Sequence, residues 1–271
     1  MEYQLKGDRH VAVIGYGAIA SYLAAAAERN GFRIAAVLIR PGREDVAAAA
    51  FPDAQLETLA DNLPGGLDCV LDCAGHAGLR THGPAILAAG TPLITVSSGA
   101  LADPDLEREL AAAARKGKTR LRIASGAIGA LDALASAACG QLRKVTYTGR
   151  KPPAGWRGSP AEDVADLDRL EGPLVHFEGS ARDCASAYPK NANVAASVAL
   201  AGLGLDNTSA RLIADPSIDR NLHEVTAEGD FGEFTFSIAG RGLPDNPRSS
   251  ALTAMSLVRA VRDRSASLVV G

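Results

Sequence analysis

A glycine-rich segment near the start of the chain limits the possible folds more than any other feature. It reads GYGAIA at residues 15–20 and matches the pattern G-x-G-x-x-A. A short apolar run at residues 10–14 precedes it, and an Ala-rich stretch at residues 18–30 follows and is closed by Gly31. The apolar run predicts a buried parallel strand and the Ala-rich stretch predicts a helix, so the glycines are expected in a strand-to-helix turn.

A turn of this kind suits a dinucleotide cofactor. Gly15 permits the tight turn, and Gly17 allows a pyrophosphate to approach the backbone at the helix N-terminus, where Ala18 and Ile19 begin the helix. Ala20 in place of a third glycine still allows close packing of helix and strand. The alternative is a plain strand-to-helix turn in a fold that binds no nucleotide.

The tip of the second predicted strand, at residues 33–39, bears on the choice of cofactor. A carboxylate there would bind the adenosine ribose 2′-OH of NAD, but the segment that follows is RPGR, with Arg40 and Arg43. Two arginines suit the 2′-phosphate of NADP. The alternative is that both arginines belong to a solvated loop. The cofactor is therefore predicted to be NAD or NADP.

Alternating strand and helix patterns continue through the first 125 residues. Further strands are expected at residues 68–73, 92–96 and 120–124, with helices at 78–89 and 103–116. This alternation predicts βαβ units in a doubly wound parallel sheet, so the fold class is α/β with an N-terminal Rossmann domain at residues 1–125.

The pattern changes after residue 125. Residues 142–150 alternate with period two, and strand-like segments at 209–214, 221–227 and 233–239 follow an Ala-rich helical run. This predicts a smaller α+β substrate or catalytic domain with a mixed or antiparallel sheet at residues 126–245. A final amphipathic helix at residues 246–271, opened by Asn246-Pro247, is expected to pack back on the first domain.

Composition excludes several classes of protein. The chain has 271 residues, of which 47% are hydrophobic and 22% are charged. Its net charge is −3, whereas proteins that bind nucleic acids usually have an excess of basic residues. Its four cysteines have no metal-ligand spacing, so no metal site is expected, and they are predicted to be buried thiols. No apolar run has the length of a membrane span and no signal-peptide pattern opens the chain, so a cytoplasmic location is expected.

Three polar clusters in the second half are candidates for substrate or cofactor binding. Residues 125–132 (SGAIGALD) are Gly-rich and open a helix, so their N–H groups could cradle a carboxylate or a ribose. Residues 189–193 (PKNAN) place an amine and two amides at a second helix start. Residues 215–224 (DPSIDRNLHE) lead into a strand that carries His223 near its start.

Taken together, these motifs resemble one family. GxGAIx, SGAIGALDA, PKNANVAASVALAG, DPxxxxNxHE and NPRSSALTAMS occur in the order seen in L-aspartate dehydrogenases, and the resemblance covers nearly the whole chain. It implies a Rossmann domain and an α+β domain. It also implies oxidation of L-aspartate with NAD or NADP to iminoaspartate, which hydrolyses to oxaloacetate and ammonia or feeds quinolinate synthesis in NAD formation. Ala20, where many members have glycine, is a mild departure.

The resemblance also implies roles for individual residues. The catalytic histidine of the family falls on His223, and its cofactor contacts fall on Ala127 and Asn193. Hydride leaves Cα only when the amino nitrogen has a free lone pair, so a base must first deprotonate the ammonium, and histidine suits this task near neutral pH. Activation of water for imine hydrolysis is the alternative role. Lys190 and the 125–130 loop are candidates for binding the substrate carboxylates, although Lys190 could equally be a solvated lysine.

Two other kinds of protein share parts of this pattern. A reductase of the dihydrodipicolinate reductase or homoserine dehydrogenase type has the same architecture with different substrate loops. A non-catalytic NAD(P)-sensing protein would need the glycine loop without His223. In each case the expected partner is a small molecule, with no nucleic acid and no membrane. A homo-oligomer, most simply a dimer, is expected.

Overall fold

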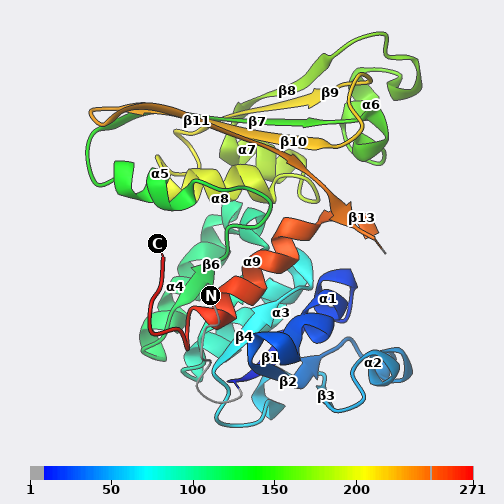
Figure 1. Cartoon of the computed structure of the whole chain (residues 1–271), viewed down its shortest axis with the longest axis vertical. Helices are drawn as coiled ribbons and strands as arrows, with labels where there is room; N and C mark the ends of the chain where they lie inside the picture. The colour runs from blue at the N-terminus through cyan, green and yellow to red at the C-terminus, as the bar shows by residue number, and fades with distance from the viewer. Residues whose placement is uncertain (1–8, 245, 271) are drawn as a thin grey trace. The chain divides into compact units, whose positions relative to one another are not determined.

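The computed structural model describes residues 9–244 and 246–270. Residues 1–8, 245 and 271, which the predicted domains also include, lie outside the described residues. The chain divides into two compact units, Met1–Ala124 with Thr253–Gly271, and Ser125–Leu252. Figure 1 shows the chain and labels most of its helices and strands.

The first unit contains a six-stranded parallel sheet. Its strands are β1 (Arg9–Ile14), β2 (Phe32–Leu38), β3 (Gln55–Glu57), β4 (Cys69–Asp72), β5 (Leu93–Thr95) and β6 (Leu121–Ile123). Their spatial order is β3-β2-β1-β4-β5-β6, with every pair parallel. This is the strand order of a doubly wound dinucleotide-binding fold, so the predicted fold class is confirmed.

The strands of this sheet are connected by α1 (Ala18–Ala27), α2 (Glu44–Ala50), α3 (Gly75–Ala88) and α4 (Pro104–Lys116). The C-terminal α9 (Ala251–Arg262) follows the last strand of the chain, and its residues from Thr253 onward belong to this unit. The first residues of α4 explain where it begins: the Asp103 side chain accepts a hydrogen bond from Asp105 N–H at 2.9 Å, and Pro104 occupies the first turn. Leu257 and Val261 of α9 are buried in the same core cluster as Val11, Val13 and Leu71 of the sheet.

Two expectations are wrong. The final helix does not start at residue 246, because residues Asn246–Ser250 form strand β13, which pairs with β12 (Gly242–Leu243). The pairing with β12 accounts for this conformation, since strand partners outweigh the helix start that the sequence of this segment indicates. The cysteines are also not all buried: Cys69 and Cys184 are, whereas Cys139 is exposed.

The second unit is built on a five-stranded mixed sheet. Its strands are β7 (Leu142–Lys151), β8 (Leu174–Ser180), β9 (Ser209–Ala214), β10 (Asn221–Gly229) and β11 (Gly232–Gly240), in the spatial order β11-β10-β7-β9-β8. β7 and β9 are parallel and the other pairs are antiparallel. A tight turn joins β10 and β11, with Gly229 paired to Gly232.

Helices α5 (Leu131–Ala137), α7 (Ala181–Ala187) and α8 (Asn193–Ala201) lie on one side of this sheet, and the short α6 (Ala161–Val164) follows β7 (Figure 1). Residues 194–199 of α8 are all buried, which explains why an Ala-rich sequence is needed there: small side chains let the helix pack closely. The side of the sheet covered in this way is called the covered face below.

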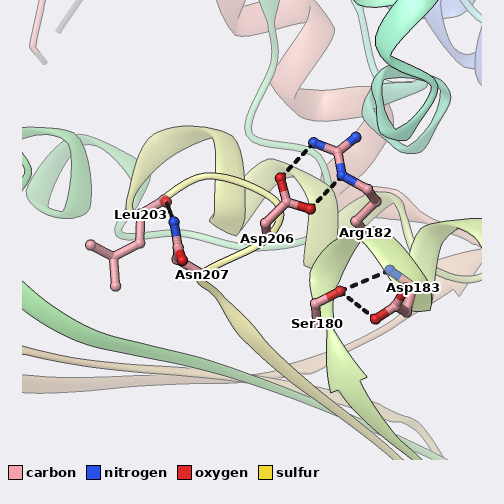
Figure 2. A network of polar contacts seen from close by, with 6 residues as sticks. All are labelled: Ser180, Arg182, Asp183, Leu203, Asp206 and Asn207. Atoms are coloured by element: carbon pink, nitrogen blue, oxygen red, sulfur yellow. Dashed lines mark hydrogen bonds and ion pairs between the residues drawn. The ribbon is translucent and has the colours of Figure 1, made fainter.

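Polar contacts fix the start of α7 (Figure 2). The Ser180 hydroxyl accepts a hydrogen bond from Asp183 N–H at 3.1 Å and donates one to its carboxylate at 2.6 Å. Arg182 donates two hydrogen bonds to Asp206, at 2.5 and 2.9 Å, and so ties α7 to the loop before β9. α7 in turn carries the buried Cys184 onto the covered face.

Candidate active site

The glycine turn of the first unit has the geometry of a dinucleotide-binding loop. Gly15 has a φ of 92°, in the left-handed region, and its N–H donates to Leu38 O at 2.8 Å. A Cβ at this position would lie 3.1 Å from the Cβ of Ala74, so both the backbone angle and the close neighbour favour glycine.

Gly17 fulfils a different requirement. It is exposed, it precedes α1, and a Cβ built on it would have no heavy atom within 4 Å. Open space beside the first N–H groups of a helix is where the pyrophosphate of a dinucleotide binds. Ala18 and Ile19, half-buried at the start of α1, provide N–H groups that no turn of the helix satisfies. The residues present therefore fit NAD or NADP.

The loop after β2 exposes Arg40 and Arg43, as predicted. The sequence patterns did not predict the elements that follow, α2 and β3. Glu44, the first residue of α2, accepts a hydrogen bond from Gly42 N–H at 3.1 Å, and this bond closes the loop. The two guanidinium groups form no ion pair among the described residues.

Asp72 at the end of β4 is a buried acid that the sequence analysis did not single out. It accepts hydrogen bonds from the Thr95 hydroxyl at 2.7 Å and from Ala74 N–H at 3.1 Å. Burial raises the pKa of its carboxyl group, and the hydrogen bonds from Ser97, Thr95 and Ala74 oppose that shift. Asp72 thus ties together the carboxyl ends of β4 and β5, at the edge where ligands bind in such sheets.

In the second unit, the predicted binding loop at residues 125–130 has a constrained backbone. Gly126 and Ala130 have φ values of 66° and 59°, and a positive φ is uncommon for alanine. Ala127 is buried at 7% exposure. A Cβ on Gly129 would lie 2.7 Å from the ring of Phe236, so glycine allows the loop to rest on β11.

His223 lies on β10 with its side chain on the covered face, at 4% exposure. Its direct neighbours in the sheet are Gly149 of β7 and Ile238 of β11. Because Phe236 is two residues from Ile238, the 125–130 loop rests on the same face as the histidine. Burial, with a smaller effect of the Lys151 charge, lowers the pKa of His223 to about 4, so the imidazole is neutral near pH 7.

Tyr147 holds the histidine ring in place. Its hydroxyl lies 2.8 Å from Nδ1 of His223, and both side chains are buried. The phenol reaches the imidazole by crossing Gly149, where a Cβ would lie 2.7 Å from the Tyr147 oxygen. Gly149 is extended, so the glycine serves the close approach of Tyr147 and not an unusual backbone angle.

Lys190, the predicted carboxylate-binding residue, is exposed and lines a pocket of about 860 Å³ in the second unit. Asn191 and Asn221 also line this pocket, and Asn221 lies two residues before His223 on β10. Asn193, a predicted cofactor contact, is the half-buried first residue of α8. The pocket has a further lining residue that the sequence analysis missed, Lys151, which is buried at 9% exposure.

A pattern in β7 could have revealed Tyr147, Gly149 and Lys151. They occupy alternate positions of a strand and therefore share one face, together with buried Val145. A lysine at an inward position of such a strand is unusual and points to a specific role. The described residues contain no group of three or more His, Cys, Asp and Glu that could hold a metal ion. They also contain no helix with both the length and the apolarity that a bilayer crossing requires.

Comparison with known proteins agrees with this arrangement. Residues 132–264 match the family model for the C-terminal part of aspartate dehydrogenase, and residues 14–124 match that for the NAD-binding domain of homoserine dehydrogenase. The chain is 58% identical to an L-aspartate dehydrogenase of Ruegeria pomeroyi, over 97% of this chain and 95% of the relative. The chain belongs to the L-aspartate dehydrogenase family.

Another L-aspartate dehydrogenase, from Cupriavidus necator, is 46% identical over 94% of this chain and 97% of the relative. The crystal structure of aspartate dehydrogenase from Thermotoga maritima is similar with a TM-score of 0.78 and 25% sequence identity, and the match covers 97% of this chain and 99% of that one. The resemblance to the L-aspartate dehydrogenase family inferred from the motifs is thereby confirmed.

The open space at Gly17 leads to the first prediction. Gly17→Val should fold normally, because no atom lies near the new side chain, but it should weaken NAD binding by about tenfold or more by filling the space where a pyrophosphate approaches. Fluorescence titration with NADH measures the affinity. Gly65→Val, at a glycine with equally open surroundings, is the matched control. Unchanged NADH affinity in the Gly17 variant would place the pyrophosphate elsewhere.

The lowered pKa of His223 predicts that the stability of the protein depends on pH. Because the folded chain protonates this group only near pH 4, whereas the unfolded chain does so near 6.5, its contribution to stability is lost as pH falls through that window. Between pH 7 and pH 5 the loss is roughly 2 kcal/mol. The variants His223→Asn and His223→Gln lack this titrating group. Between pH 7 and pH 5 the free energy of unfolding, measured with urea, should therefore fall by about 2 kcal/mol less in these variants than in the wild type. Parallel pH dependences in all three proteins would contradict the buried, neutral state.

Proposed function

We propose that this chain catalyses the NAD(P)-dependent oxidation of L-aspartate to iminoaspartate, with His223 as its catalytic base. The observation that carries the proposal is a neutral, buried histidine held by Tyr147 on the covered face that also bears the inward-facing Lys151. Membership of the L-aspartate dehydrogenase family supports the same activity. The family model for homoserine dehydrogenase matches only the NAD-binding part of the chain, at residues 14–124.

The chemistry requires a proton acceptor before hydride transfer. The ammonium of aspartate must lose a proton so that its nitrogen lone pair can form the C=N bond as hydride leaves Cα. A neutral imidazole can take that proton, whereas an imidazolium cannot. NAD or NADP, when bound, supplies the hydride acceptor. The carboxylates of aspartate need cations, and the pocket that contains Lys190 offers them.

Tyr147 acts in this scheme as a positioning residue. In the tautomer whose Nδ1–H donates to the Tyr147 oxygen, Nε2 of His223 has a free lone pair and can act as the base. The hydrogen bond thus fixes the orientation of the ring, and Nε2 is the reacting nitrogen in the tautomer that carries its proton on Nδ1. Ala127 and Asn193 are proposed, by the family resemblance, to contact the cofactor. Homodimerisation and a cytoplasmic location remain predictions from the sequence.

Activity measurements test the proposal. Wild-type protein should oxidise NADH or NADPH in the presence of oxaloacetate and ammonia, and should reduce NAD or NADP in the presence of L-aspartate. His223→Asn should lower kcat by roughly 10²–10⁴, the usual cost of losing a general base, with coenzyme affinity within twofold of wild type. His82→Asn, at a half-buried histidine of α3, is the control and should keep wild-type activity. Full turnover in His223→Asn would make the histidine structural, and no aspartate turnover in the wild type would overturn the function.

A further prediction concerns the coenzyme. Arg40 and Arg43 are proposed to pair with the 2′-phosphate of NADP, because both are exposed at the end of β2. Arg40→Ala combined with Arg43→Ala should weaken NADPH binding about tenfold more than NADH binding. Arg115→Ala, at an exposed arginine of α4, controls for a general loss of positive charge. An equal loss for both coenzymes would remove these arginines from 2′-phosphate recognition.

A further inference from the structure

Lys151 is a buried cation with no counter-charge. Its ammonium donates one hydrogen bond, to Asn191 Oδ1 at 2.7 Å, and lies 4.6 Å from the centroid of the Trp156 ring. Within the described part of the chain it makes no ion pair. An ammonium has three N–H donors, so two remain for a ligand.

The groups around Lys151 do not compensate its charge. Burial lowers the pKa of His223 and of His176 to about 4 and raises that of the Cys184 thiol to about 12, so all three are uncharged near pH 7. Asn191 and Trp156 provide only a dipole and a ring face. Removing an ammonium from water without an opposite charge is costly, and a bound anion would offset that cost.

Lys151 opens into the pocket of about 860 Å³, whose charged lining is strongly positive. The charged side chains that line it are Lys151, Arg157, Lys190, Arg220, Arg241 and Asp219. Arg157 and Arg220 are paired with Asp168 and Asp219, at 2.6 and 2.9 Å. Lys190 forms no ion pair within the described residues, so it remains available with Lys151 for an anion that carries more than one charge. Arg241 forms none either, but its charge already contributes to lowering the pKa of the Asp219 carboxyl.

We propose that this pocket is a dicarboxylate site and that the Lys151 ammonium, oriented by Asn191, binds one carboxylate of the substrate. The proposal rests on the proposed oxidation of aspartate, and it names the residue that anchors the substrate. His223 does not itself line the pocket, but Asn221, two residues before it on β10, does. Two observations place the anchor on Lys151 and not on Lys190. The Lys151 ammonium is held in one position by Asn191 and Trp156, whereas Lys190 is exposed. Lys151 also shares the covered face with Gly149, the direct neighbour of His223 in the sheet.

Succinate provides a test that does not depend on turnover. It has two carboxylates and no amino group, and its binding to the full chain is measured by calorimetry and by the rise in Tm, without coenzyme. Lys151→Met should weaken succinate binding roughly 10- to 100-fold, the cost of a lost charged hydrogen bond. Lys144→Met, at an exposed lysine of the same strand, should bind succinate within twofold of wild type.

The ligand-free Tm separates a binding role from a structural one. Replacing an uncompensated buried charge by an apolar side chain should leave the Tm of Lys151→Met at or above that of wild type. Lys151→Gln is the second variant: it keeps a donor for Asn191 and should lose succinate binding to the same degree. Wild-type succinate affinity in a folded Lys151→Met or Lys151→Gln protein would overturn the proposal.

Kinetics then distinguish this proposal from the proposed function. If the wild type oxidises L-aspartate, Lys151→Met should raise KM for L-aspartate at least tenfold and leave KM for the coenzyme unchanged. An unchanged KM for L-aspartate would contradict the anchor even though the function stands. If the wild type does not oxidise L-aspartate but Lys151→Met still loses succinate, the proposed function fails and the dicarboxylate site stands.

Discussion

The register between β7 and β10 is the constraint on which the second unit depends. It sets Gly149 opposite His223, and the period of two along β7 then places Tyr147 and Lys151 on the same face. A slip of one residue would turn the histidine to the other face of the sheet. Gly149 adds a second condition, because only a residue without a side chain lets the Tyr147 phenol cross the strand to reach the imidazole.

The two units use their buried positions differently. In the first, the core cluster is made of apolar side chains from β1, β2, β4, α1 and α9, and the ligand-binding feature is a backbone turn at its edge. In the second, burial itself tunes the chemistry: it keeps His223 neutral and leaves Lys151 charged without an acidic partner, with a pKa lowered to about 8. An apolar residue in place of that lysine should stabilise the fold. Burial of a charge at a cost in folding free energy is typical of binding and catalytic sites.

Local features were predictable from the sequence, and features that depend on distant contacts were not. The glycine turn at Gly15 and Gly17 and the start of α4 follow from a few neighbouring residues, and the structure places them as predicted. The role of Lys151 depends on Asn191, 40 positions along the chain, and on a sheet register that no short motif encodes. The final helix was predicted to start too early, because residues 246–250 form β13 and pair with β12. This conformation depends on the partner strand and not on the local helix propensity. His223 was found through family motifs, but its partner Tyr147 was not.

The charge state of His223 is the most direct test of this account, since the catalytic base and the acid sensitivity both depend on it. Imidazole ¹⁵N chemical shifts report the protonation of each ring nitrogen, and His223→Asn identifies the signals that belong to His223. On lowering the pH of the ligand-free protein from 8, these signals should remain those of a neutral ring until the pH approaches about 4. A doubly protonated His223 ring at pH 6 would contradict the account.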